Sequence, residues 1–252
     1  MKLGVIGVGH LAGSILRGLS KAGITPSDIH LSPRGHGPDL AQRYDFVLTP
    51  DNRTLVDQCD IVLLAVRPAD AGAAVRGLPW RAGQVLVSAC AGVTLKQLAA
   101  EAAPAAVVRI MPLTASELGA SPTVVFPMRP ELRPLLDAIG STIALQSEDQ
   151  FETATVSAAI YGWAQALIRT GVDWSANHGL DPALARQLVA RTFVAAGRMQ
   201  SEHEASMDEI LTSLCTPGGI TEAGLNHLES QDMPEAWQDA CDIVLKKLRG
   251  ET

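Results

Sequence analysis

The feature that most constrains the fold is a glycine-containing turn close to the first residues of the chain. Leu3–Ile6 is an apolar run of strand length, and the residues after the turn have the spacing of a helix. The turn matches the G-x-G-x-x-A fingerprint of dinucleotide-binding folds, with the residues Gly7, Val8, Gly9, His10, Leu11 and Ala12. The first glycine permits the tight turn, the second lets a pyrophosphate approach the backbone, and the alanine permits close packing of helix on strand. The segment therefore predicts a dinucleotide site; a turn that holds no phosphate is the alternative.

Composition and charge exclude several classes of protein. Of 252 residues, 47% are hydrophobic and 19% are charged, as in ordinary globular chains of one or two domains. The net charge of −7 argues against a nucleic-acid partner, and no apolar run approaches the roughly 20 residues that span a bilayer. The 4 cysteines form no C-x-x-C pair, and the 6 histidines have no ligand spacing. We therefore expect a cytoplasmic protein with reduced thiols, no signal peptide, no membrane partner and no metal site.

The first part of the chain alternates between strand-like and helix-like segments. Residues 60–66 are nearly all apolar and rich in β-branched side chains, as in a parallel strand buried on both faces. Strands are predicted at 3–6, 28–32, 46–48, 60–66, 84–88, 107–112 and 122–126, and helices from residue 11 and at 40–44, 51–58 and 95–102. This alternation predicts an α/β dinucleotide-binding domain, residues 1–148, with a Rossmann-type doubly wound sheet.

From about residue 148 the strand-like runs stop. Helices are predicted within 151–177, from Asp181-Pro182 to about residue 199, and at 207–214, 221–228 and 234–248. The helix after Pro182 has an apolar face, including Leu184, Leu188 and Phe193, that is too broad for a helix lying on one small domain. We therefore predict an all-α C-terminal domain, residues 149–252, that binds substrate and forms a homodimer or higher homo-oligomer through its helices.

The end of the second predicted strand bears on the choice of cofactor. Folds that prefer NAD place an Asp or Glu there to bind the ribose 2′-hydroxyl. Here the segment is Ser32-Pro33-Arg34, which has no carboxylate, and Arg34 can pair with a 2′-phosphate through its fork of donors. The segment therefore favours NADP(H), with Ser32 and Arg34 as ligands. A solvated loop arginine in an NAD(H) enzyme is the alternative.

Five segments together resemble the pyrroline-5-carboxylate reductases, the enzymes that make proline with NAD(P)H, and the resemblance runs almost end to end. The most specific is the Thr-Pro-Gly-Gly-Ile-Thr run at 216–221, with Gly224-Leu225 beyond it, and the others are 7–12, 64–68, 88–93 and 109–112. The resemblance implies further cofactor-binding residues. These are Ala65, Val66, Arg67 and Pro68 on the adenosine side, Ala91 and Gly92 near the nicotinamide ribose, and Met111 and Pro112 near the nicotinamide.

The resemblance also implies that the loop of Thr216, Pro217, Gly218 and Gly219, with Thr221, receives the substrate. The two glycines are expected to leave backbone N–H groups bare just before a helix, which makes a nest suited to a carboxylate. Thr221 supplies a hydroxyl that can hydrogen-bond an imine nitrogen, and it is the predicted catalytic residue. The alternative is an interhelical turn in which Thr221 only caps the helix.

The reaction implied is hydride transfer from NADPH to a cyclic imine carboxylate, either pyrroline-5-carboxylate or a close analogue. His10 is predicted to be a neighbour of the cofactor and not a base. Two departures from the family bear on the substrate: Leu113 stands where the family has Asn, and Ala159, Ile160 and Tyr161 are bulkier than the residues they replace. A reductase of another imine or keto acid, and a low-turnover NADP(H)-binding sensor or interaction module, remain open.

Overall fold

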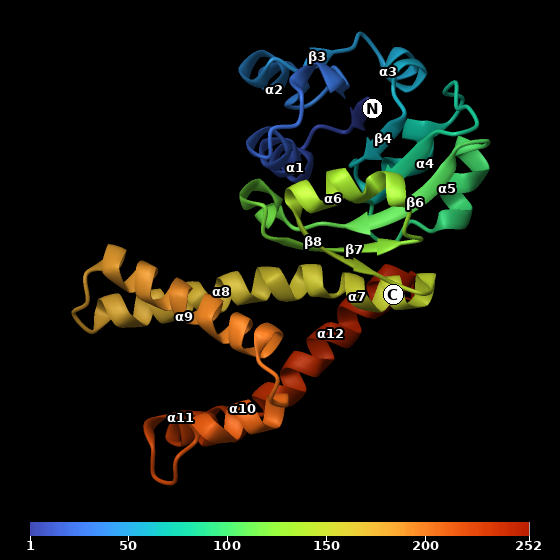
Figure 1. Cartoon of the computed structure of the whole chain (residues 1–252). Coiled ribbons are helices and arrows are strands. Elements are labelled where there is room, and N and C mark those ends of the chain that lie inside the picture. The colour runs from blue at the N-terminus through green and yellow to red at the C-terminus, as the bar shows by residue number, and fades with distance from the viewer. Residues whose placement is uncertain (252) are drawn as a thin grey trace. The chain divides into compact units, whose positions relative to one another are not determined.

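The computed structural model describes residues 1–251, which divide into two compact units (Figure 1). The first unit is Met1–Ala158 together with the chain from Leu245 onward, and the second is Ala159–Val244. Every strand of the described chain belongs to the first unit, whereas the second is formed by helices. The predicted combination of an α/β part and an all-α part is confirmed.

The first unit is built on one eight-stranded sheet with the strand order β3-β2-β1-β4-β5-β6-β7-β8. The strands are β1 Leu3–Ile6, β2 Ile29–Leu31, β3 Val47–Leu48, β4 Ile61–Leu64, β5 Val85–Ser88, β6 Ala106–Met111, β7 Ser121–Phe126 and β8 Gly140–Ala144. All neighbouring strands are parallel except β6 and β7. The order reverses between β1 and β4, and open α/β sheets bind their ligands at the carboxyl ends of the strands at such a point.

Helices cover both faces of this sheet, so that the unit has three layers. They are α1 His10–Lys21, α2 Gly37–Tyr44, α3 Asn52–Gln58, α4 Ala71–Val75, α5 Leu95–Ala102, α6 Arg133–Ile139 and α7 Glu148–Thr155. One core joins the sheet to α1, α2 and α6, and a second joins it to α3, α4 and α5. Ile61 and Leu63 of β4 enter the first core, while Val62 and Leu64 enter the second. Because both sets are buried, this strand is apolar throughout.

Every strand predicted from the sequence is present, but β8, α4 and α6 were not predicted. β8 lies at the edge of the sheet and its side chains are mostly exposed, so its sequence has no apolar run that would indicate a strand. The helices α4 and α6 have 5 and 7 residues, too few for a helical pattern to stand out.

Helix α7 marks the change to helical structure that the sequence places near residue 148. Ser147 caps it by accepting a hydrogen bond from the backbone N–H of Gln150, at 3.1 Å. Phe151 of this helix is buried in a cluster with Met111 and Val124, which holds α7 on the sheet. The first compact unit extends beyond the predicted boundary near residue 148, to Ala158, because α7 packs on β7.

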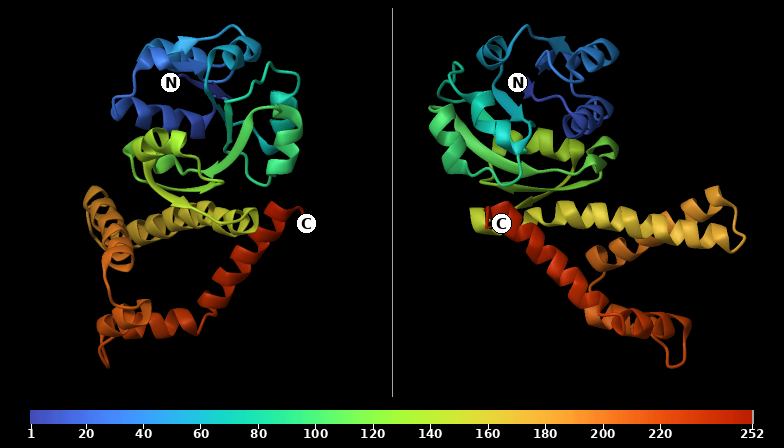
Figure 2. Two further views of the ribbon diagram at one scale, coloured as in Figure 1. Left: turned by 45° about the vertical axis from the view of Figure 1, so that its right-hand side comes forward. Right: turned by 180° about the vertical axis from the view of Figure 1, so that it is seen from behind.

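The second unit is helical (Figure 2). It contains most of α8 Ser157–Asn177 and of α12 Met233–Arg249, with α9 Pro182–Glu202, α10 Met207–Leu214 and α11 Ile220–Glu229 between them. The predicted helix start at Asp181-Pro182 is confirmed, because the Asp181 carboxylate accepts hydrogen bonds of 3.0 Å from the N–H groups of Ala183 and Leu184. The helices α8 and α9 pack closely at Gly171, where an added Cβ would lie 3.1 Å from a methyl group of Val189.

Helix α9 is packed on one side and exposed on the other. Ala185 is fully buried, whereas Leu184, Leu188 and Phe193 are 51%, 57% and 38% exposed in the single chain. The broad apolar face expected from the sequence is therefore present and largely uncovered within the described residues. No helix in the described part of the chain is long and apolar enough for a membrane span.

Candidate functional site

The fingerprint turn joins β1 to α1 at the carboxyl edge of the sheet. Gly7 has a φ of +89°, and an added Cβ would lie 2.6 Å from the Val66 side chain and 2.8 Å from the Ala65 backbone, so this position requires glycine. Gly9 is exposed, and an added Cβ there would meet no atom within 4 Å. Open space therefore borders the backbone at the start of α1, where no side chain caps the helix. These are the properties that a pyrophosphate-binding turn needs.

The loop after β2 is tied to this turn by backbone contacts. The His36 N–H donates to the Val8 carbonyl at 2.9 Å, and Gly35 pairs with Val8 in an isolated bridge. The Gly7 N–H donates to the Ser32 hydroxyl at 3.4 Å. Ser32 is consequently buried beside the fingerprint, while Arg34 projects from an exposed part of the same loop and forms no ion pair with any residue in 1–251. Arg34 is therefore available for a phosphate next to the turn.

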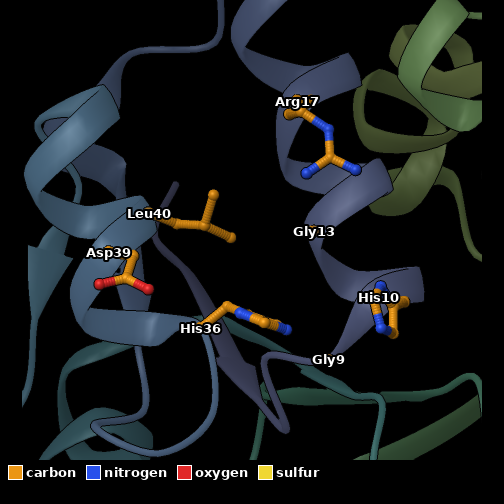
Figure 3. A pocket seen from close by; sticks show the side chains of 7 residues that line it. All are labelled: Gly9, His10, Gly13, Arg17, His36, Asp39 and Leu40. Atoms are coloured by element: carbon orange, nitrogen blue, oxygen red, sulfur yellow. The ribbon is translucent and has the colours of Figure 1, made fainter.

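A cavity of about 170 Å³ opens between α1 and the start of α2 (Figure 3). Its lining is formed by Gly9, His10, Gly13, Arg17, His36, Asp39 and Leu40. The rings of His10 and His36 lie 5.6 Å apart, and Arg17 is paired with Glu117 at 2.9 Å. The cavity is smaller than the roughly 300 Å³ at the low end of ligand pockets, so it suits a part of a dinucleotide and not the whole. His36 was missed from the sequence because only the folded loop brings it to the fingerprint.

The segment after β4 lies beside the same turn. Ala65 donates its N–H to the Ile6 carbonyl at 2.9 Å, and Val66 contacts the position of Gly7. Arg67 and Pro68 follow at the surface, where a short 3₁₀ turn begins. The structure thus brings this predicted group of cofactor-binding residues to the edge that carries the fingerprint.

The segment after β5 is linked to the segment after β4. The Cys90 thiol donates to the Val66 carbonyl at 3.4 Å, and burial raises the pKa of that thiol. The buried Cys90 thiol therefore links these two segments. Ala91 and Gly92 follow it; Gly92 has a φ of +70°, and an added Cβ would lie 3.0 Å from the Leu248 carbonyl oxygen.

At the end of β6, Met111, Pro112 and Leu113 are buried. Leu113 is 7% exposed; its N–H donates to the Ser121 hydroxyl at 2.8 Å, and its carbonyl accepts from Ser116 at 2.7 Å. The backbone at this position is thus satisfied within the chain, and its side chain is apolar and buried.

A buried arginine precedes this segment and holds α7 against β6. The Arg109 guanidinium has no exposed surface, pairs with Glu148 at 2.9 Å and with Glu152, and stacks over Phe151 at 4.5 Å. Glu148 also accepts the Leu95 N–H at 2.7 Å, at the start of α5. The sequence placed Arg109 in a motif without assigning it a role. In the structure Arg109 joins β6 to α7, and Glu148 of α7 in turn contacts the start of α5.

The predicted substrate loop lies in the second unit. Gly218 has a φ of +73°, and Gly219 occupies the cap position of α11, so that Thr221 is the second residue of the helix and not its cap. The Gly219 N–H donates to the Thr216 carbonyl at 2.8 Å, and the Gly218 N–H donates to the Glu222 carboxylate at 2.7 Å. The expectation that both N–H groups are bare is therefore wrong. Thr221 itself is exposed at the start of the helix.

Among the described residues, no group of three or more His, Cys, Asp and Glu side chains is arranged to hold a metal ion. A glycine turn at the switch point of a doubly wound sheet, with an arginine in the loop after β2, is the arrangement of a class of proteins, the NADP-dependent oxidoreductases.

Comparisons with known proteins identify the family. The profile of "Pyrroline-5-carboxylate reductase dimerisation" matches residues 148–250, and that of "NADP oxidoreductase coenzyme F420-dependent" matches residues 2–92. Pyrroline-5-carboxylate reductase 3 of Xenopus laevis is 30% identical, over 97% of this chain and 93% of its own length, and the enzyme of Corynebacterium melassecola is 28% identical over 94% of each. The reductase structure from Streptococcus pyogenes superimposes with a TM-score of 0.88 at 27% identity, covering 99% of this chain and 98% of its own. The chain belongs to the pyrroline-5-carboxylate reductase family.

Proposed function

We propose that this chain catalyses the NADPH-dependent reduction of a cyclic imine carboxylate, pyrroline-5-carboxylate, to proline. The observation that carries the proposal is the open backbone at Gly9, beside an uncapped helix start and an unpaired Arg34. Membership of the family supplies the reaction type. The free cysteines of the described chain support a cytoplasmic location.

The residues of the first unit have a binding role in this proposal. The backbone around Gly9 and the start of α1 hold the pyrophosphate, and Arg34, with Ser32 beside it, holds the 2′-phosphate. Gly92 and Met111 border the nicotinamide end. When bound, NADPH supplies the hydride, and the chain has to position the acceptor carbon against it.

The residues of the second unit act on the substrate. The loop from Thr216 to Gly219 binds the substrate carboxylate, and the Thr221 hydroxyl orients the imine nitrogen and handles its proton. An iminium carbon is already electrophilic, so the reaction needs no strong acid. The exposure of Thr221 at the start of α11 supports this role.

We also propose that the chain acts as a homodimer through its C-terminal helices. The proposal is supported by the exposed apolar side chains of Leu184, Leu188 and Phe193, which a second copy would cover. Sedimentation or light scattering at micromolar concentration tests this, and a monomeric mass would contradict it.

One observation favours a second candidate function. Leu113 is buried and cannot replace the hydrogen bonds of an amide, which favours a different cyclic imine or a keto acid as the substrate. Oxidation of NADPH, followed by absorbance against a panel of cyclic imine carboxylates and keto acids, separates the two candidates. Turnover with none of them, together with tight binding of NADPH, would leave only a sensor or interaction module.

A further inference from the structure

Glu222 contacts the predicted substrate loop, although nothing in its sequence context indicated such a contact. It lies in the first turn of α11, and its carboxylate accepts the Gly218 N–H at 2.7 Å. The path of this loop is held by the hydrogen bond of 2.8 Å from the Gly219 N–H to the Thr216 carbonyl, and the approach is close enough that an added Cβ on Gly219 would lie 2.5 Å from the Thr216 hydroxyl oxygen. The Gly218 N–H therefore has a defined direction, and a carboxylate of the chain itself is the group that it meets.

The charge of this carboxylate has no cation beside it. Glu222 forms no ion pair with any lysine, arginine or histidine of residues 1–251. Its compensation comes from the backbone N–H group and from the positive end of the α11 dipole. A substrate carboxylate placed at the same loop uses the same two sources of compensation.

We propose that Glu222 is a specificity-determining residue, whose carboxylate competes with the carboxylate of an imine substrate for the Gly218 N–H. This inference rests on the proposed function of the loop. Two carboxylates cannot accept from one N–H in good geometry, and they repel each other at close range. A carboxylate substrate therefore has to displace the Glu222 side chain, and a cyclic imine without a carboxylate does not. Glu222 thus reduces the preference of the loop for binding cyclic imines with a carboxylate over cyclic imines without one.

A purely structural role would have a different signature. A glutamate at this place in a helix can act as half of a capping box, reaching back to a backbone N–H and stabilising the helix start. Loss of such a cap lowers the stability of the loop and affects every substrate alike. The ratio of the KM values for a carboxylate substrate and for its analogue without the carboxylate separates the two roles, because a structural defect leaves this ratio unchanged.

The test compares the wild type with Glu222→Ala and Glu222→Gln, using pyrroline-5-carboxylate and 1-pyrroline. Glu229→Gln is the matched control, because it removes an exposed carboxylate at the other end of the same helix. We expect Glu222→Ala to lower the KM for pyrroline-5-carboxylate by roughly threefold to tenfold with the KM for 1-pyrroline unchanged. Glu222→Gln should act in the same direction, and the control should change neither KM. A rise in the KM for pyrroline-5-carboxylate, or an equal change for both imines, would overturn the proposal.

A binding measurement keeps this test independent of turnover. If the wild type binds NADPH but reduces neither imine, the proposed function fails, and calorimetric titration of the NADP⁺-loaded protein with proline and with pyrrolidine then tests Glu222. Tighter proline binding by Glu222→Ala than by the wild type, with pyrrolidine unaffected, supports the competition. Equal proline binding by the two proteins, or none by either, overturns it.

Discussion

The two glycines of the fingerprint turn have opposite roles, and this gives the sharpest prediction. Gly7 has a φ of +89°, and an added Cβ would approach the Ala65 backbone to 2.8 Å, where a hydrogen bond of 2.9 Å to Ile6 fixes the chain. The left-handed conformation alone costs a side chain about 1–2 kcal/mol, and the steric contact adds to this. We expect Gly7→Ala to lose at least about 2 kcal/mol of stability, equivalent to a fall in Tm of roughly 4–8 °C for a chain of this size.

Gly9 has an extended conformation, φ −96° and ψ −162°, and open space around an added Cβ. Gly9→Ala should therefore keep its stability within about 0.5 kcal/mol of the wild type. The new methyl group would stand where the pyrophosphate approaches, so the Kd for NADPH should rise at least about tenfold, or about 1.4 kcal/mol.

The assay is a thermal melt of each variant together with a fluorescence titration by NADPH. We expect Gly7→Ala to lose stability. We expect Gly9→Ala to lose affinity for NADPH and to keep its stability. Wild-type affinity in Gly9→Ala would refute the placement of the cofactor. Equal falls in Tm for the two variants would refute the geometric argument.

Three further predictions concern single side chains. Arg34→Ala should weaken NADPH binding by about 10–100-fold, the loss of a charge-assisted contact of about 1.5–3 kcal/mol, with NADH binding hardly changed in the same titration. Similar losses for the two cofactors would remove Arg34 from the 2′-phosphate site. Thr221→Ala should lower turnover by roughly tenfold or more while sparing the affinity for NADPH, and an unchanged rate would exclude Thr221 from the reaction. Burial, and after it Lys2, lowers the pKa of His30 below 6.5, so the folded state binds this proton less well than the unfolded state and stability falls as the pH drops below 6.5. The fall in Tm between pH 7.5 and 5.5 should be shallower in His30→Leu, and parallel curves would contradict this.

The sequence predicted the buried parts of the fold well because burial leaves a pattern. β4 is apolar at every position because its two faces enter two cores. β8 has no such pattern, since its edge position leaves Ser141 and Ile143 partly in solvent, and it was missed for that reason. A helix start could also be predicted from its capping residues: α9 begins at Asp181-Pro182, as the sequence indicates.

The candidate site was harder to predict where it depends on contacts between distant residues. The fingerprint is local, so its strand, turn and helix could be read directly from Leu3 to Ala12. Two contacts depend on the folded conformation of the loops, namely that of His36 with Val8 and that of Glu222 with Gly218. The residue types involved do not predict either contact. The expectation of a bare nest failed because hydrogen-bonding groups next to a helix start find partners within the chain when one is in reach.

The role of Arg109 shows the same limit. A charged residue inside an apolar strand is costly unless it is paired, and its partners Glu148 and Glu152 lie far along the chain on α7. The sequence does not show that these three side chains lie close together in the fold. In the structure they join the strand that ends at Met111 to the helix that begins the C-terminal part.

The most direct test of the account uses NADPH labelled with deuterium at the transferred C4 position. The purified protein is incubated with this cofactor and pyrroline-5-carboxylate, and the product is analysed by mass spectrometry and NMR. We expect one proline for each NADPH oxidised, with one deuterium at C5 of its ring. Tight binding of NADPH with no deuterated proline would contradict the claim that this chain transfers a hydride to a cyclic imine carboxylate.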